Sequence, residues 1–110
     1  MNRTELYYVN LEPTVGAEIK KTRPCVIVSP DEINKHMQTV IVAPLTTPER
    51  NIPSRVKVAA TPLSGLKNDS FAALDQVKAI DKRRCCSYIG KVSEDEAQEI
   101  ADVLCKMFQY

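Results

Sequence analysis

Residues 23–30, "RPCVIVSP", decide the fold class of this 110-residue chain. Residues 25–28 are apolar at consecutive positions, which predicts a β-strand that is covered on both faces. Ser29 and Pro30 supply the turn signal that ends this strand. Arg23 precedes the apolar run, so its guanidinium group is either a solvated strand end or directed at a negatively charged group. Such a strand requires neighbouring strands and packing layers from the rest of the chain.

Further strand patterns lie on both sides of this run. Residues 6–11 are rich in β-forming residues and are followed by Pro13, and residues 55–58 alternate polar and apolar side chains. The run 39–45 contains Pro44, which cannot donate a hydrogen bond to a sheet and therefore predicts an edge strand or a strand end. The remaining predicted strands are 70–74, 77–80 and 87–92.

The extended helix pattern lies at the end of the chain. Ser93 and Glu96 form a capping-box signature, and acidic residues fill the first turn, where the helix dipole favours them. Apolar residues follow at helical spacing: Ala97, Ile100, Ala101, Leu104, Met107 and Phe108. We expect Ile100, Leu104, Met107 and Phe108 to be core. Many short strands followed by one amphipathic helix predict a single domain over residues 1–110, with a small curled sheet or barrel and the helix packed on it.

Composition excludes several classes of protein. Apolar residues make up 44% of the chain and charged residues 26%, a balance typical of soluble globular domains, and no apolar run is long enough to span a membrane. The four cysteines match no zinc or redox spacing, so we expect small core residues in a reducing, cytoplasmic compartment. The net charge of +1 predicts no partner, but basic residues cluster at 20–23 and 82–84 and would form an anion-binding patch if they share a face.

Candidate chemistry centres on Arg23 and Thr46. The single histidine, His36, lies in a polar turn, and the sequence has no metal-ligand spacing and no glycine-rich phosphate loop. If the strands at 23–28 and 39–45 are antiparallel neighbours, Arg23 and Thr46 meet at one rim of the sheet. A guanidinium beside a hydroxyl suits a phosphate group. The alternative is an arginine in water and a threonine that caps a turn.

Four motifs in this order, "PTVGAE" (13–18), "TRPCVIVSP" (22–30), "VAPLTT" (42–47) and "LDQVKAIDK" (74–82), closely resemble the MazF/PemK family. The resemblance extends over residues from about 6 to 108. It implies a small SH3-like or CcdB-type β-barrel with a C-terminal helix. It also implies a toxin of a bacterial type II toxin–antitoxin system that cleaves single-stranded RNA, mostly mRNA, at short sequences without a metal or other cofactor. The toxin would be a homodimer, silenced by a cognate antitoxin with which it forms a DNA-binding complex.

The resemblance also assigns site residues. Arg23 and Thr46 would be the catalytic pair, and Glu18, Asp75 and Gln76 match the acidic and "DQ" positions that border the RNA channel. Lys20, Lys21 and Thr47 would support RNA binding, and sequence choice would come from loops 14–21 and 47–55. Some members carry a further arginine and a histidine at the positions of Ala73 and Ala17 here, so that version of the site is missing from this sequence.

The expected reaction is attack of the RNA 2′-hydroxyl on the adjacent phosphate, which excludes DNA as a substrate. Arg23 is a poor proton acceptor because its pKa exceeds about 12. Glu18 or Asp75 could be the general base if burial raises its pKa. Two alternatives remain open: a CcdB-like toxin that binds a topoisomerase through its last helix without being an enzyme, and a degenerate relative that only binds an antitoxin.

Overall fold

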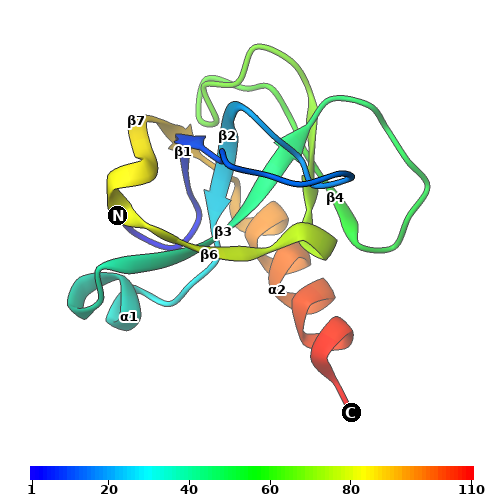
Figure 1. Cartoon of the computed structure of the whole chain (residues 1–110). Coiled ribbons are helices and arrows are strands. Elements are labelled where there is room, and N and C mark those ends of the chain that lie inside the picture. Colours follow the sequence, from blue (N-terminus) through cyan, green and yellow to red (C-terminus); the bar gives the residue numbers. More distant parts are fainter.

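The computed structural model describes residues 1–110 and contains seven antiparallel strands and two α-helices (Figure 1). The strands are β1 (Glu5–Asn10), β2 (Thr22–Ile27), β3 (Thr39–Thr46), β4 (Arg55–Val58), β5 (Ser70–Ala73), β6 (Lys78–Asp81) and β7 (Cys85–Lys91). The helices are α1 (Asp31–His36) and α2 (Glu94–Phe108), with short 3₁₀ turns η1 (Leu74–Gln76) and η2 (Lys82–Arg84). None of the helices has the length and apolarity needed to cross a membrane.

The strand order is β4-β5-β3-β2-β1-β7, with β6 also paired to β3. The prediction of a mainly β fold with a C-terminal helix is confirmed. The sheet is not closed, however, so the expectation of a closed barrel is not confirmed. Residues 59–66 lie beside β7 in place of a closing strand: Lys91 donates its backbone N–H to the carbonyl of Leu63 (3.1 Å). A Cβ atom on Gly90 would lie 2.4 Å from the carbonyl oxygen of Ser64, so this close approach requires glycine.

Pro44 lies inside a central strand, and its expected position at an edge or strand end is therefore wrong. One edge of β3 pairs with β2, where Cys25 faces Pro44. The other edge pairs with β6 as far as Val42 and with β5 from Leu45 onward. Ala43 and Pro44 have no strand partner on that second edge, so a residue without an N–H group is accommodated there.

Two apolar cores occupy opposite faces of the sheet. The first core includes Val26, Ala43 and Leu45 and is covered by α2 through Ile100. The second core includes Cys25, Ile27 and Val42, with Ile19 from the β1–β2 connection packed against it. The two sets alternate along β2 and β3, as side chains of a strand covered on both faces do.

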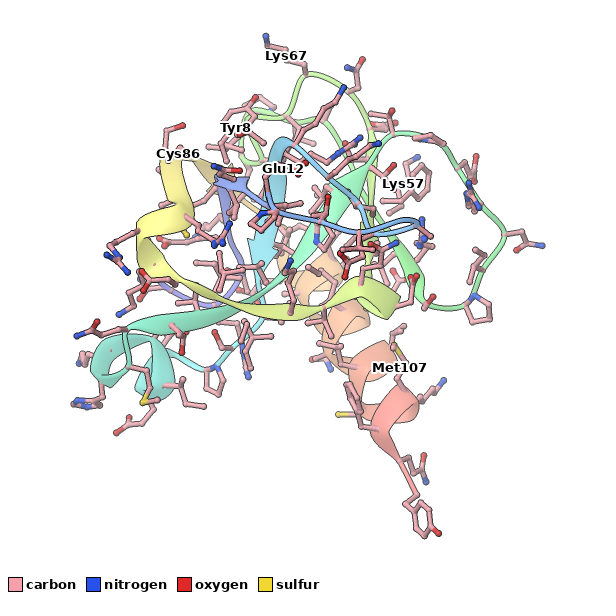
Figure 2. The ribbon with its side chains drawn as sticks, in the orientation of Figure 1. Tyr8, Glu12, Lys57, Lys67, Cys86 and Met107 are labelled. Atoms are coloured by element: carbon pink, nitrogen blue, oxygen red, sulfur yellow. The ribbon has the colours of Figure 1, made fainter.

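The last turn of α2 extends beyond the first core. Figure 2 shows Met107 on this projecting segment, where its side chain is partly exposed, and Phe108 is 71% exposed. The expectation that Met107 and Phe108 belong to the core is therefore wrong. The helix begins at a complete capping box, in which Ser93 and Glu96 satisfy each other's backbone N–H groups. Its apolar face contacts the sheet through Ala97, Ile100 and Leu104, and no part of the sheet reaches the turn that follows.

Candidate active site

Arg23 and Thr46 lie on adjacent antiparallel strands at one rim of the sheet. The register of β2 and β3 places Cys25 opposite Pro44, and continuing it by two residues brings Arg23 opposite Thr46. Arg23 is two residues from Cys25 on β2, and Thr46 is four residues from Val42 on β3. Because side chains alternate between the two faces of a strand, both lie on the face of the second core, away from α2. Both are half-buried. The rim geometry therefore places a guanidinium and a hydroxyl on the same side of neighbouring strands.

The Arg23 guanidinium is held by one hydrogen bond. Its Nε–H donates to the backbone carbonyl of Lys20 at 2.9 Å. Its terminal nitrogens make no hydrogen bond or ion pair within the chain, so they are available to an oxyanion. A guanidinium oriented at Nε and open at its two terminal nitrogens can bind two phosphate oxygens at once.

The connection between β1 and β2 is tethered at its base. Leu11 donates its backbone N–H to the carbonyl of Lys21 (3.1 Å), and Lys21 donates its own to the carboxylate of Glu12 (2.8 Å). This hydrogen bond lowers the pKa of Glu12. Arg84 donates to the carbonyls of Asn10 and Glu12, in the connection where Figure 2 labels Glu12. The backbone that carries Lys20 and Lys21 therefore has a defined position beside Arg23.

The tip of the same connection is fixed by two further contacts. Glu18 accepts a hydrogen bond from the backbone N–H of Val15 (2.6 Å), so one of its carboxylate oxygens is used within its own loop. Ile19 packs on the second core and donates its backbone N–H to the side-chain oxygen of Gln76 (2.7 Å). This last bond joins the connection to η1.

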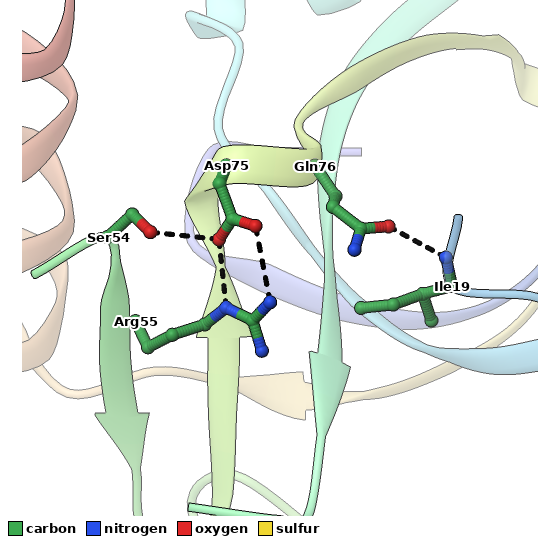
Figure 3. A network of polar contacts seen from close by, with 5 residues as sticks. All are labelled: Ile19, Ser54, Arg55, Asp75 and Gln76. Atoms are coloured by element: carbon green, nitrogen blue, oxygen red, sulfur yellow. Dashed lines mark hydrogen bonds and ion pairs between the residues drawn. The ribbon is translucent and has the colours of Figure 1, made fainter. Parts of the chain in front are cut away.

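Asp75 forms an ion pair that the sequence analysis missed (Figure 3). Arg55 donates to both Asp75 carboxylate oxygens, from Nε at 2.8 Å and from Nη2 at 3.2 Å, and Ser54 Oγ donates to one of them at 2.9 Å. The hydrogen bonds from Arg55 are the main reason that the pKa of Asp75 lies below its ordinary value. A raised pKa was the condition for Asp75 to be the general base, and this condition is not met, so the carboxylate is a poor proton acceptor.

A surface hollow of about 400 Å³ lies between the β1–β2 connection and η1. Its lining includes three of the predicted site residues, Glu18, Asp75 and Gln76, together with Lys78. Arg23, Thr46, Lys20, Lys21 and Thr47 are not among the residues that line it. Thr47 is exposed, directly after the end of β3.

Ser54 and Arg55 lie in the loop 47–55 that was expected to select bases, but the sequence did not indicate that they bind Asp75. The alternation in residues 55–58 correctly predicts that Val56 and Val58 face the core, but it predicts a solvated Arg55. The Arg55 side chain is only 9% exposed because β4 pairs with β5 and the chain then turns into η1 beside it. The sequence did contain one signal for this ion pair, namely a basic residue at the start of a strand and an acidic residue in a later turn.

The other reactive side chains lie outside this arrangement. All four cysteines are free, and burial raises the pKa of the Cys25 thiol to about 12, which suppresses its thiolate chemistry. Cys86 and Cys105 are exposed, so the expectation that the cysteines are core residues is wrong for these two. His36 ends the short helix α1 and is exposed. No group of three or more His, Cys, Asp or Glu side chains is placed to hold a metal ion.

The fold is that of a small mainly β protein with an arginine and a threonine on adjacent strands at the rim of an open sheet. A family model described as "PemK-like, MazF-like toxin of type II toxin-antitoxin system" matches residues 2–108, so the chain belongs to this toxin family. Endoribonuclease MazF of Staphylococcus saprophyticus is 31% identical over 106 residues, which cover 94% of this chain and 88% of the relative.

Solved structures share the fold. The crystal structure of MazF from Deinococcus radiodurans superposes with a TM-score of 0.85 at 20% identity, covering 100% of this chain and 97% of that one. A mycobacterial endoribonuclease in complex with its cognate antitoxin superposes with a TM-score of 0.79 at 24% identity, covering 96% and 92%. Both coverages are nearly complete, so the similarity extends over the whole domain.

Proposed function

We propose that this chain is the toxin of a type II toxin–antitoxin system and acts in the cytoplasm as a sequence-specific, metal-independent endoribonuclease on single-stranded RNA. Membership of the toxin family and the 31% identity to a protein named Endoribonuclease MazF support this activity. The observation that carries it is Arg23, oriented by Lys20 and open at its terminal nitrogens, opposite Thr46.

The proposed reaction is transesterification within the RNA. The 2′-oxygen attacks the adjacent phosphorus and loses its proton to a base, the bond from phosphorus to the 5′-oxygen breaks, and the leaving oxygen takes up a proton. The products are a 2′,3′-cyclic phosphate and a 5′-hydroxyl. Arg23 stabilises the charge that develops on the phosphate oxygens, and the Thr46 hydroxyl binds a non-bridging oxygen or the 2′-hydroxyl.

Of the two carboxylates considered for the base, Glu18 is retained. Asp75 is tied to Arg55 and Ser54, whereas Glu18 has only one of its oxygens hydrogen-bonded within the chain. Glu18 also lines the hollow beside the β1–β2 connection, where an RNA strand would have access to it.

We infer the following binding partners. Lys20, Lys21 and Lys78 would bind RNA phosphates, and loops 14–21 and 47–55, which include Thr47, would select the bases. A second copy of the chain would form a homodimer, and a cognate antitoxin would block the site, as the antitoxin complex of the mycobacterial relative suggests. The curled sheet, with residues 59–66 in its gap, supports an SH3-like or CcdB-type barrel arrangement. A CcdB-like toxin directed at a topoisomerase is not favoured, because the family match is to PemK-like, MazF-like toxins.

The test is a cleavage assay with EDTA present. Wild type, Arg23→Ala and Thr46→Val are incubated with a long unstructured RNA and with DNA of the same sequence, and the fragment ends are analysed. Lys106→Ala is the control, because Lys106 is exposed on α2, on the face of the sheet opposite Arg23. We expect discrete RNA fragments with cyclic-phosphate ends from wild type and Lys106→Ala, and intact RNA with Arg23→Ala. If wild type left both this RNA and a pool of randomised RNA sequences uncut, the proposal would be refuted.

A further inference from the structure

Continuous contacts connect the Arg55–Asp75 ion pair to Arg23. The ion pair fixes η1, Gln76 of η1 binds the backbone of Ile19, and the carbonyl of the next residue, Lys20, binds Arg23. Each link is a hydrogen bond of 2.7–2.9 Å or a peptide bond. Arg23 therefore receives part of its orientation from a turn that lies more than 50 residues later in the sequence.

The anchor of this series, η1, is held by several contacts. Asp75 accepts hydrogen bonds from Arg55 and Ser54, and the backbone N–H of Leu74 donates to the carbonyl of Ser54 at 3.0 Å. Leu74 is fully buried in the first core. These contacts hold η1 against the start of β4, so the side chain of Gln76 projects toward the β1–β2 connection from a fixed turn (Figure 3).

The central link is the hydrogen bond from Ile19 to Gln76. Ile19 is half-buried against the second core, and within the chain its N–H has the Gln76 side-chain oxygen as its acceptor. Leaving a half-buried N–H without an acceptor is unfavourable, so loss of this oxygen would favour a shift of the loop toward water. The carbonyl of Lys20 would move with Ile19, and the acceptor that orients Arg23 Nε would be displaced.

We propose that Gln76 is a positioning residue that sets the orientation of the Arg23 guanidinium through the backbone of Ile19 and Lys20. This proposal rests on the proposed function for its effect on RNA cleavage, but the orientation itself is a property of the free protein. It assigns Gln76 a task that depends on its side-chain oxygen as an acceptor, and it assigns Asp75 the task of holding the turn instead of proton transfer.

Two substitutions separate this task from direct contact with RNA. Gln76→Glu keeps an oxygen acceptor at nearly the same position, whereas Gln76→Met keeps the length and volume of the side chain and removes the acceptor. If Gln76 acted by donating its amide to RNA, both substitutions would remove the donor and lower kcat alike. If it positions Arg23, only Gln76→Met loses the essential atom, and the added charge of Gln76→Glu affects mainly KM.

The kinetic test uses a short RNA with one cleavage site mapped for the wild type. We expect Gln76→Met to lower kcat by about 10- to 100-fold, as small misplacements of a reacting group do, with KM changed less than about 3-fold. Gln76→Glu should recover most of that kcat. Because Gln76 acts through Arg23, adding Gln76→Met to Arg23→Lys should lower kcat by less than about 3-fold more. Equal losses in kcat for both Gln76 variants, or a full further loss in the double variant, would overturn the proposal.

A second measurement is independent of cleavage. In ¹⁵N NMR spectra of the free protein, we expect the Arg23 Nε–H and the Ile19 amide to exchange slowly with water in wild type and Gln76→Glu. Both should exchange faster in Gln76→Met, while the thermal midpoint changes little. Unchanged exchange of Arg23 Nε–H in Gln76→Met would refute the positioning role. If the wild type cleaved no RNA but this exchange pattern held, the proposed function would fail and the positioning would stand.

Discussion

Arg55 and Asp75 are joined by two parallel hydrogen bonds, of 2.8 and 3.2 Å, between the start of β4 and the turn η1. The guanidinium is nearly buried, with 9% of the side chain exposed, while the carboxylate side chain is 38% exposed. The pair therefore has the bidentate geometry that gives an ion pair its strength, with one side open to water. It fixes the turn from which Gln76 contacts the β1–β2 connection.

Arg55→Met should lower the free energy of unfolding by about 1–2 kcal/mol. The substitution leaves Asp75 without its main partner, but water can reach the exposed carboxylate and limits the loss. Lys57→Met is the matched control, because Lys57 lies on the same strand and makes a 3.6 Å ion pair with Asp69 in which both side chains are more than half exposed. We expect the control to change stability by less than about 0.5 kcal/mol. Urea unfolding at pH 7 measures the stability of both variants. Equal losses of stability in the two would show that the Arg55–Asp75 pair has no special stabilising role.

The contribution of the same pair should disappear in acid. The pKa of Asp75 is lowered in the folded chain, chiefly by its hydrogen bonds from Arg55, relative to about 3.9 in an unfolded chain. The stabilisation is therefore fully present above pH of about 4 and is lost as the pH falls through the folded pKa. The difference in stability between wild type and Arg55→Met should shrink from pH 7 toward pH 3. Other carboxylates whose pKa is lowered in the folded chain, such as Asp81, are present in both proteins, so their contributions cancel in this difference. If the difference in stability grew as the pH fell, the ion pair would not be the source of the stabilisation.

Lys20→Gln should reduce the salt dependence of RNA binding. Each phosphate contact to single-stranded nucleic acid contributes about 0.7 to the slope of log affinity against log salt concentration. We expect the slope to fall by about this amount when Lys20 loses its charge, measured by fluorescence anisotropy with the inactive Arg23→Ala protein as background. Lys106→Gln provides the control, because Lys106 is exposed on α2, on the opposite face of the sheet. Equal slopes for all proteins would exclude Lys20 from phosphate contact.

Ser93→Ala should destabilise the chain by about 1 kcal/mol, because it removes one side of the capping box of α2. Ser93 Oγ accepts from the backbone N–H of Glu96 at 3.1 Å, while the Glu96 side chain also binds the backbone N–H of Ala59 at 2.8 Å. Ser87→Ala is the control, since Ser87 is exposed on β7. Thermal and urea unfolding measure the difference, and RNA cleavage by both variants should stay near the wild-type rate. If Ser93→Ala left the free energy of unfolding unchanged, the capping box would not contribute to stability.

Most strands and the C-terminal helix could be predicted from local signals. The consecutive apolar residues before Ser29, the alternation in residues 55–58 and the capping box at Ser93 each specify one element without reference to its partners. The sequence allows β2 and β3 to be antiparallel neighbours, and with that pairing, which the structure has, Arg23 and Thr46 lie at one rim.

Features that depend on two distant segments could not be predicted in this way. Pro44 is compatible with a central strand only because β3 changes partner from β6 to β5 beside it, and nothing near Pro44 encodes that change. Arg55 is nearly buried because Asp75 compensates its charge, and the two residues lie 20 positions apart in the chain. Phe108 fits the helical spacing of the core face but lies past the end of the sheet, and spacing alone does not show how far the sheet extends.

The change of partner along β3 has a consequence for synthesis on the ribosome. Thr46 pairs with Phe71 on one edge of β3, and the connection that orients Arg23 is held by Gln76, so both depend on residues made about 25 to 50 positions after the strands they complete. A nascent chain that ends before this segment has the strands of the rim but not the contacts that fix them. The first core closes only when α2 supplies Ile100. Prematurely terminated fragments of this toxin should therefore not cleave the mRNA from which they are translated. The active form should arise only after nearly the whole chain has left the ribosome.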